Sequence, residues 1–126
     1  MDVYVYGKDF FKEQSDVKAA ITNSIDALYS RILTYENNHI PFNRIFNDDH
    51  IKYDKQGDFY TYKVQRGNLQ LRILYTYLII DARPIILMAD YFIKKKNNKK
   101  YIRQFEIFNQ ADPMAILESS KLVMSK

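Results

Sequence analysis

Three runs of strand-forming residues follow one another between residues 59 and 93, with only short turns between them. The runs cover about residues 59–65, 69–80 and 85–93 and are rich in β-branched, aromatic and other apolar side chains. Gly67-Asn68 and the segment 81–84 have the composition of turns. Two short connections in succession predict an antiparallel meander, because a tight turn can join only antiparallel neighbours.

Helical periodicity appears on both sides of this meander. Before it, apolar residues recur at helical spacing over residues 16–35, and Ser15 or Asp16 is the expected N-cap. After it, residues 101–108 show the same spacing. A last helix is predicted over residues 113–124, because an Asp-Pro pair marks its start.

A short strand is also predicted at residues 3–6, and residues 37–49 form a predicted loop. This order of elements predicts the α+β class, with an antiparallel sheet of about four strands and helices packed on one face. With 126 residues and 47% hydrophobic content, the chain is expected to form a single domain over residues 1–126.

The composition narrows the possible chemistry. The absence of cysteine excludes disulfides, cysteine-based zinc sites and thiol nucleophiles. His39 and His50 stand in no metal-ligand spacing, so neither a metal nor another cofactor is expected. No signal peptide or bilayer-length apolar run is evident, which predicts a cytoplasmic protein without a membrane partner. Net charge is −3 over residues 1–50 and +7 over residues 51–126, so a polyanion is expected on the second part.

Within the predicted strands, Arg72 is the candidate functional residue, because it interrupts an otherwise apolar run. Alternation places it on the face opposite Leu71 and Ile73. An arginine there either extends to water at the sheet edge or holds a phosphate with its planar fork. Lys63 and Gln65 share one face of the preceding strand, and they line the same surface as Arg72 only if the hairpin register allows it.

A dense basic run follows the third strand. Six basic and no acidic residues lie between Lys94 and Arg103, which is typical either of a solvated face or of a surface for a polyanion. Tyr101, at the start of the predicted helix, is either a partly buried anchor or a group that acts on a substrate. The candidate RNA-binding residues of the run are Lys94, Lys96, Lys99, Lys100 and Arg103.

Residues 59–105 together resemble the RelE/HigB superfamily of toxin–antitoxin systems, in particular its phage-derived toxin-like branch. The resemblance rests on the string Leu71-Arg72-Ile73-Leu74-Tyr75 and on the downstream string Phe92-Ile93-Lys94-Lys95-Lys96. It implies a RelE-like fold with helices packed against an antiparallel sheet, which agrees with the predicted order of elements.

The resemblance further implies the toxin of a toxin–antitoxin system: an mRNA interferase, which is a metal-independent endoribonuclease that cuts messenger RNA in the ribosomal A site. The RNA's own 2′-hydroxyl attacks the adjacent phosphate. The protein then has to accept that proton, stabilise the phosphorane and protonate the leaving oxygen. The implied partners are the ribosome, mRNA and a cognate antitoxin protein.

Four residues take catalytic roles by position in this resemblance. Lys63 acts near the 2′-hydroxyl, and Arg72 holds the scissile phosphate. Lys95 stands where the family has an arginine that acts as acid or charge stabiliser, and Tyr101 orients or stacks on the substrate. Gln65 stands where a second lysine is expected. Two alternatives therefore stay open: a non-catalytic toxin that acts on gyrase, like the ParE branch, and a basic nucleic-acid-binding module.

Overall fold

The computed structural model describes residues 1–7, 10–40, 56–94 and 100–125. Its strands form one sheet in the order β2-β3-β4-β1-β5. They are β1 (Asp2–Tyr6), β2 (Tyr60–Arg66), β3 (Leu69–Ile80), β4 (Arg83–Lys94) and β5 (Ser120–Ser125). The helices are α1 (Ser15–Asn37), α2 (Lys100–Phe105) and α3 (Pro113–Glu118), with 3-10 turns η1 (Phe10–Lys12) and η3 (Glu106–Phe108). Within these ranges, no helix has both the length and the apolar character needed to cross a membrane.

The predicted meander is confirmed, because β2 pairs with β3 and β3 pairs with β4, both antiparallel. The sheet as a whole is mixed, since β1 runs parallel to β4 and antiparallel to β5. The α+β class is therefore confirmed, but the sheet has five strands rather than about four. The additional strand comes from the C-terminal segment, which the sequence pattern placed in a helix.

The helix α3 ends earlier than predicted. It has Asp112 as its N-cap, as expected, but it ends at Glu118 instead of near Met124. The hydroxyl of Ser120 donates to the carbonyl oxygen of Ile116 at 2.6 Å, and such side-chain bonds compete with helix continuation. The residues beyond it instead pair with β1, whose edge would otherwise be exposed.

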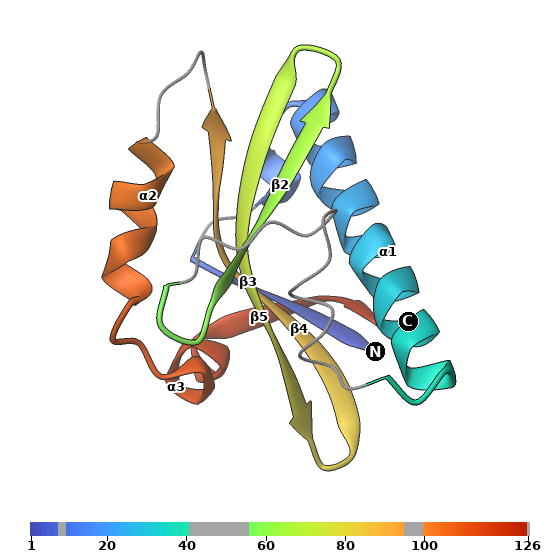
Figure 1. Cartoon of the computed structure of the whole chain (residues 1–126). Coiled ribbons are helices and arrows are strands. Elements are labelled where there is room, and N and C mark those ends of the chain that lie inside the picture. The colour runs from blue at the N-terminus through green and yellow to red at the C-terminus, as the bar shows by residue number, and fades with distance from the viewer. Residues whose placement is uncertain (8–9, 41–55, 95–99, 126) are drawn as a thin grey trace.

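Helices cover both faces of the sheet, so the prediction of a single covered face is wrong (Figure 1). The helix α1 packs on one face, while α2, η3 and α3 pack on the other. The central strands are apolar on both sides: Leu71 and Ile73 face α1, whereas Leu74 and Leu87 lie in the cluster with α2. A sheet that is apolar on both faces has to be covered on both.

A β-bulge in β4 decides which of its side chains share a face. Leu74 pairs with Asp90 but Tyr75 pairs with Met88, so Ala89 is one extra residue in β4. Before the bulge, the even-numbered residues of β4 face α1. Beyond it, the odd-numbered residues face α1 and the even-numbered ones face α2.

The apolar stripe of α1 packs on the sheet as the spacing predicted, but its N-terminus differs from the prediction. The N-cap is Gln14, which makes no side-chain capping bond, rather than Ser15 or Asp16. The Asp16 carboxylate instead accepts from the neighbouring Val17 N–H at 2.9 Å. The start of α1 therefore depends on contacts other than a conventional cap.

Two tyrosine hydroxyls tie α1 to the sheet, one near each end. Tyr91 of β4 donates to Glu13, two residues before α1, at 2.5 Å. Tyr77 of β3 donates to Glu36, in the last turn of α1, at 2.8 Å. The Tyr91 ring is buried, so its bond is the better shielded from water.

Replacing Tyr91 with phenylalanine is expected to lower the free energy of unfolding by about 1.5–3 kcal/mol, the range for hydrogen bonds to charged groups. The ring packing is kept, so the loss reports the hydroxyl bond to Glu13. Tyr77→Phe is the matched control, because its acceptor Glu36 is exposed, and we expect a loss below about 1 kcal/mol. Urea denaturation measures both variants. Equal losses would show that shielding from water does not set the strength of these bonds.

Stability is expected to fall at alkaline pH. Burial raises the pKa of the Tyr75 hydroxyl far above its ordinary value, and Tyr62 and Tyr60 add to the shift. Burial also raises the pKa of Tyr77, with its bond to Glu36 as the next cause. In the unfolded chain these hydroxyls ionise near pH 10, whereas the folded chain keeps them neutral. The stabilisation is thus complete below about pH 10 and falls steadily as the pH rises above it. The midpoint of urea unfolding should fall with pH in the original protein, and it should fall less steeply in Tyr75→Phe.

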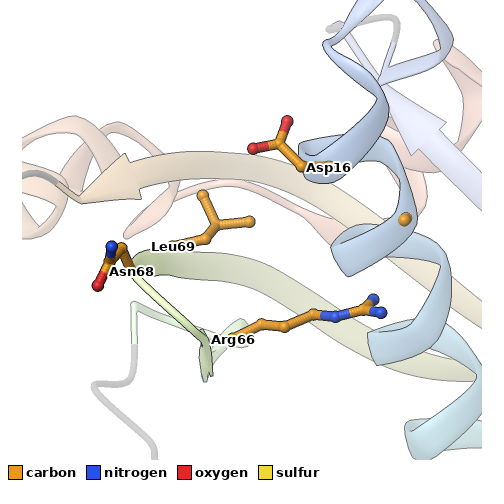
Figure 2. Close-up of a pocket in the computed structure, with 5 residues that line it drawn as sticks. Asp16, Arg66, Asn68 and Leu69 are labelled. Atoms are coloured by element: carbon orange, nitrogen blue, oxygen red, sulfur yellow. The ribbon is translucent and has the colours of Figure 1, made fainter.

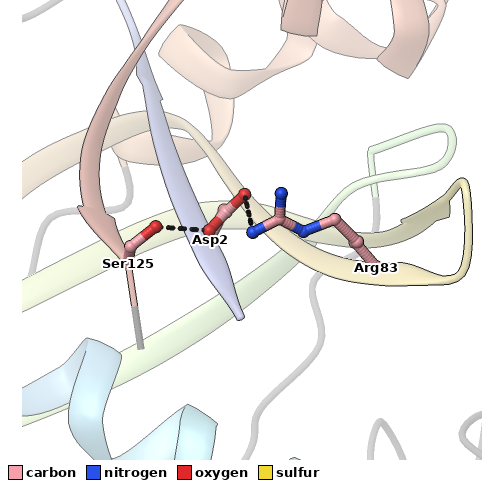
Figure 3. Close-up of polar contacts among 3 residues, drawn as sticks. All are labelled: Asp2, Arg83 and Ser125. Atoms are coloured by element: carbon pink, nitrogen blue, oxygen red, sulfur yellow. Dashed lines mark hydrogen bonds and ion pairs between the residues drawn. The ribbon is translucent and has the colours of Figure 1, made fainter.

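The first and last strands are fastened beside the turn between β3 and β4 (Figure 3). Asp2 of β1 accepts from the hydroxyl of Ser125 in β5 at 2.5 Å. The same carboxylate pairs with Arg83 at 3.5 Å. This cluster lies at the opposite end of β3 from the Gly67 turn. It is therefore separate from the end of the meander that carries Lys63, Arg72 and Lys94.

Candidate nucleic-acid interface

The register of the first hairpin places Lys63 of β2 directly opposite Arg72 of β3. The sequence had left this register open. Directly opposed residues have Cβ atoms about 5 Å apart, and like charges at that distance repel one another. Both side chains lie on the face that α2 covers, because the Arg72 guanidinium contacts Tyr101 of α2. Two cationic side chains thus start side by side on this face of the sheet.

Lys94, at the end of β4, belongs to the same face. Two residues earlier, Phe92 packs against Tyr101 with ring centroids 6.4 Å apart. Lys94 follows Phe92 by strand alternation, and it reaches this face only because the bulge at Ala89 inverts the alternation of β4. Three partly buried cations from three adjacent strands thus make up what we call the cationic face: Lys63, Arg72 and Lys94.

The Arg72 guanidinium is held in place by its neighbours. Its Nη1 donates to the carbonyl oxygen of Leu71 at 3.1 Å. Its central carbon lies 5.5 Å from the centroid of the Tyr101 ring, which is a cation–π contact. Its Nε is buried and has no hydrogen-bond acceptor within the described part of the chain. The guanidinium plane is therefore set before any ligand arrives.

Tyr101 is only 3% exposed, so it contacts Arg72 rather than solvent. Its ring also packs edge-on against Phe105 of the same helix at 5.9 Å. A buried ring cannot stack on a substrate, so Tyr101 can orient a substrate only indirectly, through its contact with Arg72. Of the two interpretations that the sequence offered, the structure favours the buried anchor.

Two residues that the sequence interpretation did not single out hold α2 against the sheet. The amide of Gln104 donates to the Asp90 carboxylate at 2.9 Å and to the carbonyl oxygen of Tyr91 at 3.2 Å. The other Asp90 oxygen accepts from the Tyr91 N–H at 2.8 Å. A signal was present in the sequence, because Asp90 is an acid inside an otherwise apolar run and Gln104 lies one helical turn after Tyr101.

The remaining candidates divide into two groups. Lys100 and Arg103 are exposed on α2, the helix whose Tyr101 contacts Arg72. Lys95, Lys96 and Lys99 lie outside the described residues. The structure thus brings together three of the four predicted catalytic positions, which are Lys63, Arg72 and Tyr101.

A hollow of about 340 Å³ lies on the opposite side of the hairpin, between its tip and the start of α1 (Figure 2). Its lining residues are Asp16, Ala19, Arg66, Asn68 and Leu69. The Arg66 side chain extends toward α1 in this view. Arg66 is therefore a cation on the same strand as Lys63 but on the other face, which makes it a useful comparison for the cationic face.

Comparison with known proteins identifies no relative: no protein-family model matches the chain, and no curated protein or solved structure matches it either. Among the described residues, no three His, Asp or Glu side chains gather into a group that could hold a metal ion. The function has to be inferred from the residues of the chain and from their arrangement.

Proposed function

We propose that this protein is the toxin of a toxin–antitoxin system and acts as a metal-independent endoribonuclease on translated mRNA. One observation carries the proposal. Lys63, Arg72 and Tyr101, which the resemblance to RelE/HigB toxins implies as site residues, come from three different elements and meet on one face of the sheet. Arg72 contacts the Tyr101 ring, and the hairpin register adds Lys63 beside Arg72.

The arrangement suits cleavage by the RNA's own 2′-hydroxyl. Arg72 offers a planar fork to the scissile phosphate and stabilises the negative charge of the phosphorane. Lys63, directly across the hairpin, first releases its ammonium proton to solvent. Its neutral amine then accepts the 2′-hydroxyl proton as the bond from the 2′-oxygen to phosphorus forms. The bond from phosphorus to the 5′-oxygen breaks, and a second proton goes to that leaving oxygen. In this proposal Lys95 donates it, as the resemblance implies.

The same proposal sets the partners and the location. The substrate is mRNA held on the ribosome in the cytoplasm, and the cationic face meets its phosphates. A cognate antitoxin would neutralise that face with an acidic segment, because opposite charge is what recognises a cluster of cations. Lys100 and Arg103 extend the positive surface along α2 and add contacts to the RNA backbone.

Inducible expression in a bacterial host tests this proposal, with primer extension across a translated message. We expect growth arrest and cuts that disappear when translation of that message is blocked. Cuts that persist in untranslated RNA would remove the ribosome from the mechanism. Growth arrest without any cuts would contradict the nuclease and favour the gyrase-directed alternative, which a supercoiling assay with purified gyrase then decides.

A second candidate is a basic nucleic-acid-binding module that does not cleave. The 3% exposure of Tyr101 favours it, because the ring is not presented to a substrate. Such a module predicts affinity for single-stranded RNA that falls steeply with salt, together with intact RNA after prolonged incubation on translating ribosomes. Cleavage under those conditions would exclude it.

A further inference from the structure

The helix α2 is too short to define its own position. It spans six residues, and isolated helices of that length are unstable in water. Its place on the sheet therefore depends on tertiary contacts. Tyr101 and Phe105 supply the apolar contacts, and the Gln104 side chain supplies hydrogen bonds to β4.

We infer that Asp90 and Gln104 are positioning residues for the cationic face. Their hydrogen bond fixes α2 on the bulged part of β4, so that the Tyr101 ring lies against the Arg72 guanidinium. The expected effect on RNA binding rests on the proposed function. The expected effect on the position of the Arg72 guanidinium is independent of that function.

The geometry of α2 makes the connection direct. Tyr101 and Gln104 are three positions apart, so both lie on the helix face that meets the sheet. The Gln104 amide reaches two acceptors, a carboxylate oxygen of Asp90 and the Tyr91 carbonyl, and two bonds fix a rotation that one bond leaves free. Asp90 is itself held by the Tyr91 N–H at the bulge.

Arg72 depends on this chain of contacts. A guanidinium on a flexible stem loses much of its rotamer freedom when it grips a phosphate. The Tyr101 ring and the Leu71 carbonyl set the plane beforehand, which leaves less freedom to lose on binding. If α2 rotates or lifts, the ring moves away and this advantage is lost, although every cation of the face is still present.

A polarity exchange tests the inference. Gln104→Glu puts a second carboxylate against Asp90 and breaks the bond. Asp90→Asn combined with Gln104→Glu restores a bond with donor and acceptor reversed, at the net charge of the original protein. Gln104→Met removes the amide while keeping a similar volume, and it gives the same information if the glutamate variant does not fold. Thermal unfolding confirms which variants are folded.

Two measurements are made on each folded variant. The first is the NMR position of the Arg72 Nε–Hε resonance, which the Tyr101 ring shifts and which is assigned by its loss in Arg72→Lys. The second is affinity for a single-stranded RNA with 2′-O-methyl groups, which cannot be cleaved. We expect the single Gln104 variants to move the resonance toward its free position and to weaken binding about fivefold, which corresponds to about 1 kcal/mol. The double variant should return both values part of the way to the original, because it restores the bond to residue 90 but not the bond to the Tyr91 carbonyl.

An unchanged Arg72 resonance in folded Gln104→Glu or Gln104→Met would overturn the inference. So would a double variant that remains as displaced as the single one. The two proposals fail separately: if the resonance responds as expected but the original protein neither binds nor cuts RNA, the positioning pair stands and the proposed function falls.

Discussion

Replacing Arg72 with alanine is expected to lower the rate of RNA cleavage by about 100–1000-fold, the usual effect of removing one preorganised group that stabilises transition-state charge. Arg72 is the cation whose guanidinium is held by two contacts, one with the Tyr101 ring and one with the Leu71 carbonyl. Binding of the uncleavable RNA should weaken by about tenfold, and its logarithmic salt slope should fall by about 1, as for one lost phosphate contact. Single-turnover cleavage on programmed ribosomes and salt-dependent titrations measure these quantities.

Arg66→Ala is the matched control for this experiment. It removes the same charge from the neighbouring strand of the same hairpin, but on the face that meets α1 (Figure 2). We expect less than about a threefold change in cleavage, since exposed charges at a distance act mainly through screened long-range attraction. The cleavage rate of Arg72→Lys should lie between those of Arg66→Ala and Arg72→Ala, because lysine keeps the charge but lacks the planar guanidinium. Equal losses in Arg66→Ala and Arg72→Ala would show that total charge, rather than the cationic face, governs activity.

Replacing Gly57 with alanine is expected to lower the free energy of unfolding by about 3 kcal/mol or more, the sum of a strained backbone and an overpacked contact. Gly57 has φ +57°, and a Cβ atom there would overlap the carbonyl oxygen of Asn109 and lie 3.1 Å from its carbonyl carbon. The Gly57 N–H also donates to the Asn109 side chain at 2.9 Å. This contact fastens the turn before β2 to the segment after η3, so the variant should also disturb α2.

Gly67→Ala is the control that measures the cost of a positive φ without a steric clash. Gly67 has a similar φ of +61°, but apart from its two chain neighbours no atom of the described residues lies within 4 Å of the position that a Cβ would occupy. We expect a loss of about 1–2 kcal/mol, which is the conformational cost alone. Urea unfolding of both variants gives the difference. A Gly57 variant no less stable than the Gly67 variant would mean that the Asn109 segment moves aside at little cost.

Most of the secondary structure could be predicted from the sequence, because it depends on local patterns. The meander, the long helix α1 and the Asp112 cap follow from alternation, helical spacing and turn residues. The C-terminal strand was missed for a physical reason. The segment from residue 119 to residue 125 has no strong period of its own, and the open edge of β1 decides its conformation.

In the candidate site, too, some features could be predicted from the sequence and others could not. The sequence marked Arg72 because an arginine interrupts an apolar strand, and it marked Lys63 as a possible neighbour. It left open whether the two are directly opposed, because the register of a hairpin is set by the number of residues in its turn, and the structure shows that only Gly67 and Asn68 form this turn. It also could not show that Tyr101 is buried beneath Arg72, since that depends on where α2 comes to rest.

Local patterns and composition were enough to predict the α+β class, the meander and the concentration of positive charge in the second part of the chain. Three features became visible only in the folded chain: helices cover both faces, a fifth strand pairs with β1 at one edge, and the bulge at Ala89 puts Lys94 on the face of Lys63 and Arg72. The reason is the range of the interactions. Periodicity, capping and turns act over a few residues, whereas a bulge and the docking of a short helix depend on packing between segments far apart in the chain.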